Sequence, residues 1–215
     1  MNAHNRILDG IEAAVNRHWR FTKDLLHVKP EYLFTVSIAD ALANGFDEIG
    51  GIDLSIKLEE PTTSVTSDVV MNASGIRGLF AKVKDFLYVD RTGKVDIYVV
   101  HDAMRNRESW VVEVKGFDPS WNKVREDVLR LSQFLLRSGN SHRCKQCFLG
   151  FPTQSDQKRR IEQEIRAVVG MDRCQTKVHS KYVETGEDAE DGMPAYYANC
   201  IVISRIVGQQ TAPRV

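Results

Sequence analysis

Two apolar segments near the middle of the chain constrain its fold more than any other part of the sequence. Residues 94–101 read KVDIYVVH, and residues 109–116 read SWVVEVKG. Valine, isoleucine and aromatic residues in runs of this length are typical of strands that are largely buried. The short stretch between the segments contains Asp102, Asn106 and Arg107, which favour a turn. We therefore expect a hairpin whose two strands lie side by side in one sheet.

The segments around this hairpin predict an α/β fold. Helical spacing of apolar residues recurs on both sides of it, and so do alternating or short apolar runs typical of strands. The predicted helices cover 5–26, 30–45, 76–87, 118–139 and 155–169, and the further strands cover 52–58, 147–151 and 196–207, with a Thr- and Ser-rich loop at 59–74. In the second helix the apolar stripe is expected at Tyr32, Val36, Ala39 and Ala43. This order predicts a central mixed β-sheet flanked by helices on both faces.

Length and composition fit one globular domain. The chain has 215 residues, of which 42% are apolar and 27% are charged. We expect a single domain over 1–215, with a core at about 30–151, an N-terminal helix at 5–26 and a C-terminal helix and strand at 155–207. No apolar run approaches the roughly 18 residues of a membrane span, and residues 1–20 lack the apolar stretch of a signal peptide. The expected location is therefore cytoplasmic, with no membrane partner.

The charge balance argues against a protein whose main task is to coat nucleic acid. The chain carries 29 basic and 29 acidic residues, which leaves a net charge of zero. A local basic surface beside an acidic site remains compatible with this balance.

Four cysteines raise the question of a zinc site. They are Cys144, Cys147, Cys174 and Cys200. The first two form a CxxC pair, with His142 nearby, but the segment reads as a strand, on which residues three apart are expected to point to opposite faces. We therefore expect buried or half-buried free thiols in place of zinc or a disulfide framework.

Three charged residues interrupt the two central strands. Asp96 lies in the first strand, and Glu113 and Lys115 lie in the second. Burying an unpaired charge in such an apolar run is costly. The three groups therefore need a partner, and a divalent cation is a suitable one.

The spacing places these groups together. Glu113 and Lys115 are two residues apart, so their side chains leave the same face of the strand, while Val112 and Val114 face the core. The hairpin can bring Asp96 beside Glu113. Two carboxylates and the Val114 carbonyl would form a hard oxygen site that suits Mg²⁺ or Mn²⁺.

Such a site suits phosphodiester hydrolysis. That reaction needs an activated water and stabilisation of charge on the phosphorus and on the leaving oxygen, and a metal ion can supply both. Lys115 would contact the water or a phosphate oxygen. Its amine could act as a base only if its pKa fell; otherwise it orients and stabilises.

The pattern of Asp96 in GKVDIYV followed by Glu113-Val114-Lys115 in WVVEVKG resembles the PD-(D/E)XK nuclease superfamily, also called restriction-endonuclease-like. The order of elements over about 30–151 looks like the core of that family. Asp96 matches the first acid, Glu113 the second and Lys115 the lysine of the motif. Val95 stands where the motif has its proline, which many members of the family also lack. The resemblance implies a restriction-endonuclease-like fold and a Mg²⁺-dependent endonuclease that acts on DNA.

Members of this family often carry a further acid on the first core helix. Glu31 is the candidate for that role, and Asp40 is nine residues further on. At 3.6 residues per turn the two lie on opposite sides of the helix, so at most one can face the site. The alternative for Glu31 is a surface acid that is favoured at a helix N-terminus.

The helix that follows the motif offers a basic face. Lys123, Arg130 and Arg137 recur every seven residues and could follow a phosphate backbone. The alternative is a solvated face that pairs with Glu126 and Asp127.

Three other interpretations stay open at this level. The same fold could serve as a non-catalytic nucleic-acid-binding or assembly subunit, or as an RNase or a structure-specific resolvase. A structural sheet in which Lys115 pairs with a carboxylate on the neighbouring strand is the third. A single site would cut one strand, so double-strand cleavage would need a homodimer or two events.

Overall fold

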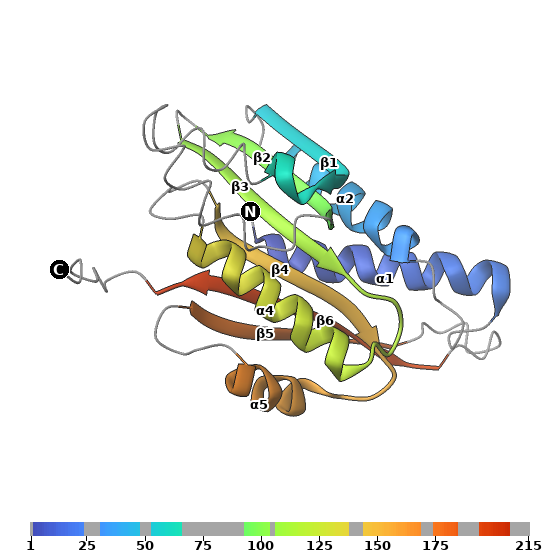
Figure 1. The fold of residues 1–215 in the computed structure, drawn as a ribbon. Coiled ribbons are helices and arrows are strands. Elements are labelled where there is room, and N and C mark those ends of the chain that lie inside the picture. Colours follow the sequence, from blue (N-terminus) through green and yellow to red (C-terminus); the bar gives the residue numbers. More distant parts are fainter. Residues whose placement is uncertain are drawn as a thin grey trace, which may run out of the picture.

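A computed structural model describes residues 2–23, 31–47, 53–65, 93–103, 106–137, 144–168, 174–184 and 194–206. These residues form an α/β fold around one sheet of six strands (Figure 1). In chain order the elements are α1 (Ala3–Thr22), α2 (Glu31–Asp47), β1 (Asp53–Pro61), β2 (Lys94–Ala103), β3 (Asn106–Val114), α4 (Trp121–Arg137), β4 (Cys144–Thr153), α5 (Lys158–Val168), β5 (Cys174–Val183) and β6 (Tyr196–Arg205).

The sheet is mixed, as the sequence predicts. Its strand order is β1-β2-β3-β4-β6-β5. Strands β3 and β4 are parallel, and every other neighbouring pair is antiparallel. A parallel pair needs a crossover connection, and α4 supplies it between β3 and β4. The expected hairpin is confirmed as β2 and β3, which pair from Ala103 with Asn106 to Ile97 with Val112.

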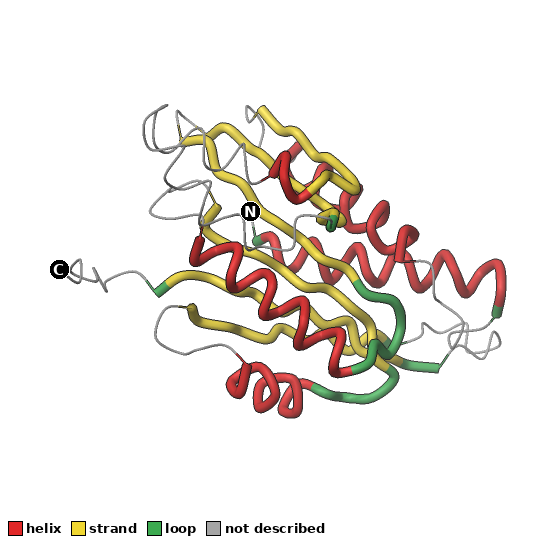
Figure 2. The backbone as a smooth tube through the Cα atoms, in the orientation of Figure 1, coloured by secondary structure: helices red, strands yellow, loops and turns green. Residues whose placement is uncertain are grey.

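Helices cover both faces of the sheet, which also confirms the prediction. Figure 2 shows α4 and α5 on the near face and α1 and α2 behind the strands. Each face has its own apolar core. The core under α1 and α2 includes Ile97, Val112 and Phe148, and the core under α4 and α5 includes Tyr98, Val111 and Leu149. Strands β2, β3 and β4 are therefore apolar on both faces, which explains their nearly continuous apolar sequences.

Helices α1 and α2 pack closely at a glycine. A Cβ atom at Gly10 would lie 2.5 Å from the Cα of Ile38 and 2.9 Å from the carbonyl oxygen of Ser37. Only a residue without a side chain allows the two backbones to approach this closely.

The cysteine prediction is half right. All four cysteines are free and buried, as expected. The argument from opposite faces is wrong, because Cys144 and Cys147 lie in the same core under α4 and α5 together with Cys174. The register between β3 and β4 shifts where Ser109 pairs with Cys144 and Trp110 with Gln146. This irregularity adds one residue to β4, and it brings both thiols to one side.

Several segment predictions need correction. Strand β1 continues to Pro61, and 62–65 form a helical turn, so the predicted loop is wrong over 59–65. Strand β5 was not predicted. In α2 the buried side chains include Phe34, Ile38 and Leu42. Of the expected stripe, Ala39 is buried, Val36 and Ala43 are half-buried, and Tyr32 is exposed. The predicted helix at 76–87 and the remainder of the loop lie outside the described residues.

None of the described helices is both long enough and apolar enough to cross a membrane.

Candidate active site

The candidate site lies where the ladder between β2 and β3 ends. Backbone pairing of the two strands stops at Ile97 and Val112. One residue beyond, the side chain of Asp96 replaces a backbone acceptor, because Oδ2 accepts a hydrogen bond of 2.7 Å from the N–H of Val114. The end of the ladder thus holds the Asp96 carboxylate against β3.

Glu113 lies in the interior of the protein. Its strand β3 runs between β2 and β4, and α4 covers the face on which the side chain stands. The residue is 2% exposed. Oε2 forms an ion pair of 2.7 Å with Nη2 of Arg130. Oε1 is buried and has no hydrogen-bond partner among the described residues. The face that carries Glu113 is therefore a second core, beside the one that Val112 and Val114 enter.

Lys115 follows the last residue of β3. Its N–H donates to the carbonyl oxygen of Gly150 at 2.9 Å, which extends the pairing with β4 by one residue. Its ammonium lies 3.0 Å from Oδ2 of Asp127, and it donates to the carbonyl oxygen of Val114 at 3.2 Å. The ammonium is thus held between the end of β3 and helix α4.

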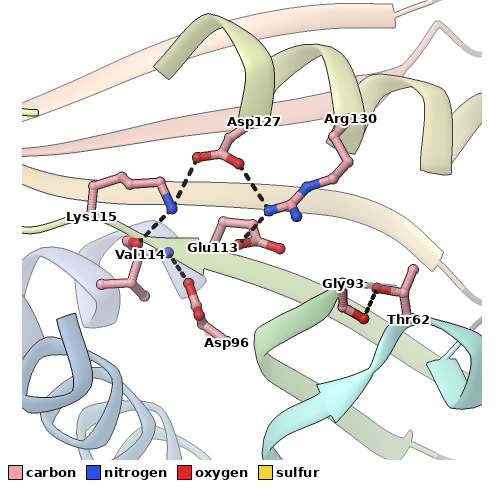
Figure 3. Close-up of polar contacts among 8 residues, drawn as sticks. All are labelled: Thr62, Gly93, Asp96, Glu113, Val114, Lys115, Asp127 and Arg130. Carbon is pink, nitrogen blue, oxygen red and sulfur yellow. Dashed lines mark hydrogen bonds and ion pairs between the residues drawn. The ribbon is translucent and has the colours of Figure 1, made fainter. Parts of the chain in front are cut away.

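Asp127 connects the two cations of the site. One oxygen pairs with Lys115, and the other accepts from Nη2 of Arg130 at 2.9 Å. Figure 3 shows the resulting chain from Lys115 through Asp127 and Arg130 to Glu113, with Asp96 of the neighbouring strand β2 bonded to Val114. Three carboxylates therefore face two cations, which leaves an excess of one negative charge when all are ionised.

Burial makes this excess charge costly. Burial raises the pKa of Asp96, although the hydrogen bond from Val114 and the charge of Lys115 oppose the increase. Burial and the neighbouring Asp96 charge raise the pKa of Glu113 to about 8, against the opposing effect of Arg130. Two carboxyl groups with raised pKa values in a shared site would be stabilised in their charged form by an additional cation.

Lys115 is a cation at neutral pH. Burial by itself would lower its pKa, but the charge and the hydrogen bond of Asp127 raise the pKa above its ordinary value. The raised pKa favours a role in which the ammonium orients the water and stabilises charge on the phosphate, and it disfavours a role as a general base.

Glu31 is close to the site, whereas Asp40 is further along the same helix. Glu31 is the first residue of α2 and is exposed. Its charge contributes to the raised pKa values of Asp96 and Lys115, so it stands at the rim of the site. Asp40 is exposed too.

The donor set fits a hard divalent cation. Among the described residues no three His, Cys, Asp or Glu side chains group together as metal ligands. The candidate set consists of the Asp96 carboxylate, the unpartnered Oε1 of Glu113 and the carbonyl oxygen of Val114. Such oxygens suit Mg²⁺ or Mn²⁺. The buried orphan oxygen and the excess negative charge both favour a cation there.

Sequence reasoning did not assign Asp127 and Arg130 to the site. It placed Arg130 on a basic face with Lys123 and Arg137, and it offered pairing with Asp127 as the alternative. The pairing of Arg130 with Asp127 is confirmed, but the solvated face is not, because Asp127 is buried and Arg130 also pairs with buried Glu113. Lys123 is exposed, and the side chain of Arg137 lies outside the described part. A usable signal was Asp127 itself, an acid that interrupts the apolar stripe of α4 and is 8% exposed.

No family model matches the chain, and no curated protein or solved structure was found to be similar to it.

Proposed function

We propose that this protein is a metal-dependent nuclease that hydrolyses DNA phosphodiester bonds, an endonuclease of the PD-(D/E)XK type. The observation that carries the proposal is the meeting of Asp96, Glu113 and Lys115 at the end of one hairpin, in a buried setting where three acidic side chains face two basic ones. The order α2, β1, β2, β3, α4, β4 supports it further, because it is the order of elements that the motif's resemblance to restriction-endonuclease-like proteins implies.

Asp96, Glu113 and the carbonyl group of Val114 would hold Mg²⁺ or Mn²⁺. A bound divalent ion supplies an activated water near neutral pH and stabilises charge on the phosphate. The protein contributes the placement of these oxygens. The N–H of Val114 fixes one oxygen of Asp96, and Arg130 fixes one oxygen of Glu113. Because one oxygen of each carboxylate is held in this way, the direction of the other oxygen is fixed as well.

Lys115 contributes a positive charge next to the oxygens. Asp127 keeps the amine protonated and restricts its position. A fixed ammonium can donate a hydrogen bond to a phosphate oxygen or orient the attacking water, and it needs no reorganisation during the reaction. Glu31 at the rim adds negative charge to the same region, which favours a cation there.

The test is cleavage by the purified protein with Mg²⁺ or Mn²⁺ on linear, circular and branched DNA and on RNA. We expect DNA to be cut. Lys115→Ala should reduce cleavage by about a hundredfold or more, since one preorganised charge is lost. Lys177→Ala, which removes an exposed lysine on β5, should leave cleavage unchanged. Equal activity of Lys115→Ala and the unaltered protein would contradict the mechanism.

The ion pairs that already occupy the site favour one other function. Lys115 and Arg130 balance two of the three carboxylates, as they would in a non-catalytic subunit that binds nucleic acid or assembles with a partner. Calorimetry distinguishes the two functions. DNA binding without any binding of Mg²⁺ or Mn²⁺ would favour the non-catalytic subunit.

A further inference from the structure

Arg130 is bound to the candidate site through a single nitrogen. Both of its described ion pairs, to Oε2 of Glu113 at 2.7 Å and to Oδ1 of Asp127 at 2.9 Å, run through Nη2. An arginine that grips a carboxylate firmly uses two parallel N–H groups, and a one-nitrogen contact is the weaker arrangement. Nη1 lies instead beside Gly93, where a Cβ atom would be 3.5 Å away from it.

The two partners of this ion pair differ in exposure. The Glu113 side chain is 3% exposed, while the Arg130 side chain is 33% exposed. The carboxylate therefore has a fixed place inside the protein, and the guanidinium reaches it from the solvent boundary on a long side chain. Of the two groups, Arg130 is the one whose long side chain can carry its charge into solvent.

Arg130 contacts the carboxylate of Glu113, which is also the group proposed to hold the metal ion. One oxygen of Glu113 is engaged by the guanidinium, and the other, Oε1, has no partner among the described residues. A cation of two charges beside Oε1 would repel the guanidinium a short distance away. The two cations therefore compete for one carboxylate.

We infer that Arg130 is an exchangeable counter-cation of Glu113, which occupies the carboxylate in the ion-free protein and gives way to a divalent ion. Resting on the proposed function, this inference deepens it, because it makes Arg130 the residue that sets the affinity of the site for its ion. Asp127 keeps the guanidinium on α4 after the exchange, since that ion pair does not involve Glu113.

The inference predicts that removing the charge of Arg130 strengthens ion binding, whereas a substitution within a binding site usually weakens it. In Arg130→Gln the positive charge next to Glu113 is gone, while both oxygens of the carboxyl group stay in place. A divalent ion beside Oε1 then meets no repulsion from a guanidinium group, which favours binding of the ion.

The experiment is calorimetric titration of the whole chain with MnCl₂ and, separately, with MgCl₂. We expect Arg130→Gln to bind the ion about tenfold more tightly than the unaltered protein. The matched control is Lys123→Gln, which removes an exposed charge on the same helix seven residues earlier and should change the affinity less than twofold. Thermal unfolding gives a second measurement, because tighter binding predicts a larger rise of Tm with added ion in Arg130→Gln.

Each outcome decides the inference. Tighter binding by Arg130→Gln, or binding by this variant alone, supports it. Equal or weaker binding by Arg130→Gln, when the unaltered protein binds the ion and cuts DNA, overturns the inference and leaves the proposed function standing. Absence of ion binding in every variant overturns both.

Discussion

Asp127 sets both the charge and the position of Lys115. It is the strongest of the influences that raise the pKa of the amine, and its oxygen lies 3.0 Å from the ammonium. A residue that acts through another in this way is a positioning residue, and such residues commonly contribute ten- to hundredfold to activity. Its role can be separated from a purely structural one by the pH dependence of the reaction.

We predict that Asp127→Asn lowers the cleavage rate by about ten- to hundredfold, since the amide keeps the shape but cannot hold the ammonium as firmly. The pKa of Lys115 should fall as well, because the negative charge that raises it most is lost. The alkaline limb of the pH–rate profile, where Lys115 loses its proton, should therefore move to lower pH.

The profile is measured for Asp127→Asn and for Glu126→Gln, which removes the exposed neighbouring acid on α4. Glu126→Gln should behave as the unaltered protein does. A slower Asp127→Asn enzyme with an unshifted alkaline limb would mean that Asp127 acts on stability alone.

The two carboxylates of the central strands could be predicted from the sequence. A charge within a strand that is apolar on both faces is costly, so Asp96 and Glu113 stand out in their segments. Arg130 carries no such signal. Its heptad spacing with Lys123 equally predicts a solvated face, and only the packing of α4 over β3 shows that it reaches Glu113.

Among the elements, α1 and α2 depend on a single missing side chain. We predict that Gly10→Ala lowers the free energy of unfolding by about 2–3 kcal/mol, because the added methyl group would collide with backbone atoms of Ile38, which cannot rotate away. Helix propensity alone would give a gain of about 1 kcal/mol for this change. The two effects thus differ in sign.

Urea unfolding of Gly10→Ala measures this change. Ala13→Gly, the reverse substitution at an exposed position of α1, is the control and should cost only about 1 kcal/mol through propensity. Stabilisation by Gly10→Ala would show that the helices can separate at little cost.

Elements with strong periodicity were predictable, and elements without it were not. The hairpin of β2 and β3 and the helix α4 follow directly from their apolar patterns. Strand β5 was missed because its buried residues, Cys174, Val178 and Val183, are four and five apart and fit no period of two. The stripe of α2 was misplaced because the helix has apolar residues on several sides, and only its contact with α1 selects Phe34, Ile38 and Leu42.

Two histidines that are far apart in the sequence stack against each other and connect α1 with β5. The rings of His4 on α1 and His179 on β5 lie 3.6 Å apart between centroids. Burial, together with the charges of His4, Lys177 and Lys158, lowers the pKa of His179 to about 4. Burial and Lys177 lower the pKa of His4 as well.

These directions predict a loss of stability in mild acid. An unfolded histidine takes up a proton near pH 6.5, whereas folded His179 resists it until the pH is about 4. Its contribution is therefore complete above pH 6.5, declines as the pH falls from 6.5 to 4, and is absent below that. The urea midpoint should decrease over this interval.

The variant that isolates the effect is His179→Gln, which cannot take up a proton. Its urea midpoint should depend less on pH between 6.5 and 4 than that of the unaltered protein. Parallel pH dependence in the two proteins would assign the acid sensitivity to other groups.

Helix α1 has a consequence for how the chain is made. It is the first described element, yet it packs against β4, β5 and β6, and Lys181 of β5 is bonded to Asp9 and Glu12 of the helix. Those strands are synthesised after α1. Helix α2 can cover part of α1 early, but the side of α1 that faces the sheet stays uncovered until these strands are synthesised. Folding of this half of the molecule is therefore expected to complete only after translation of β6.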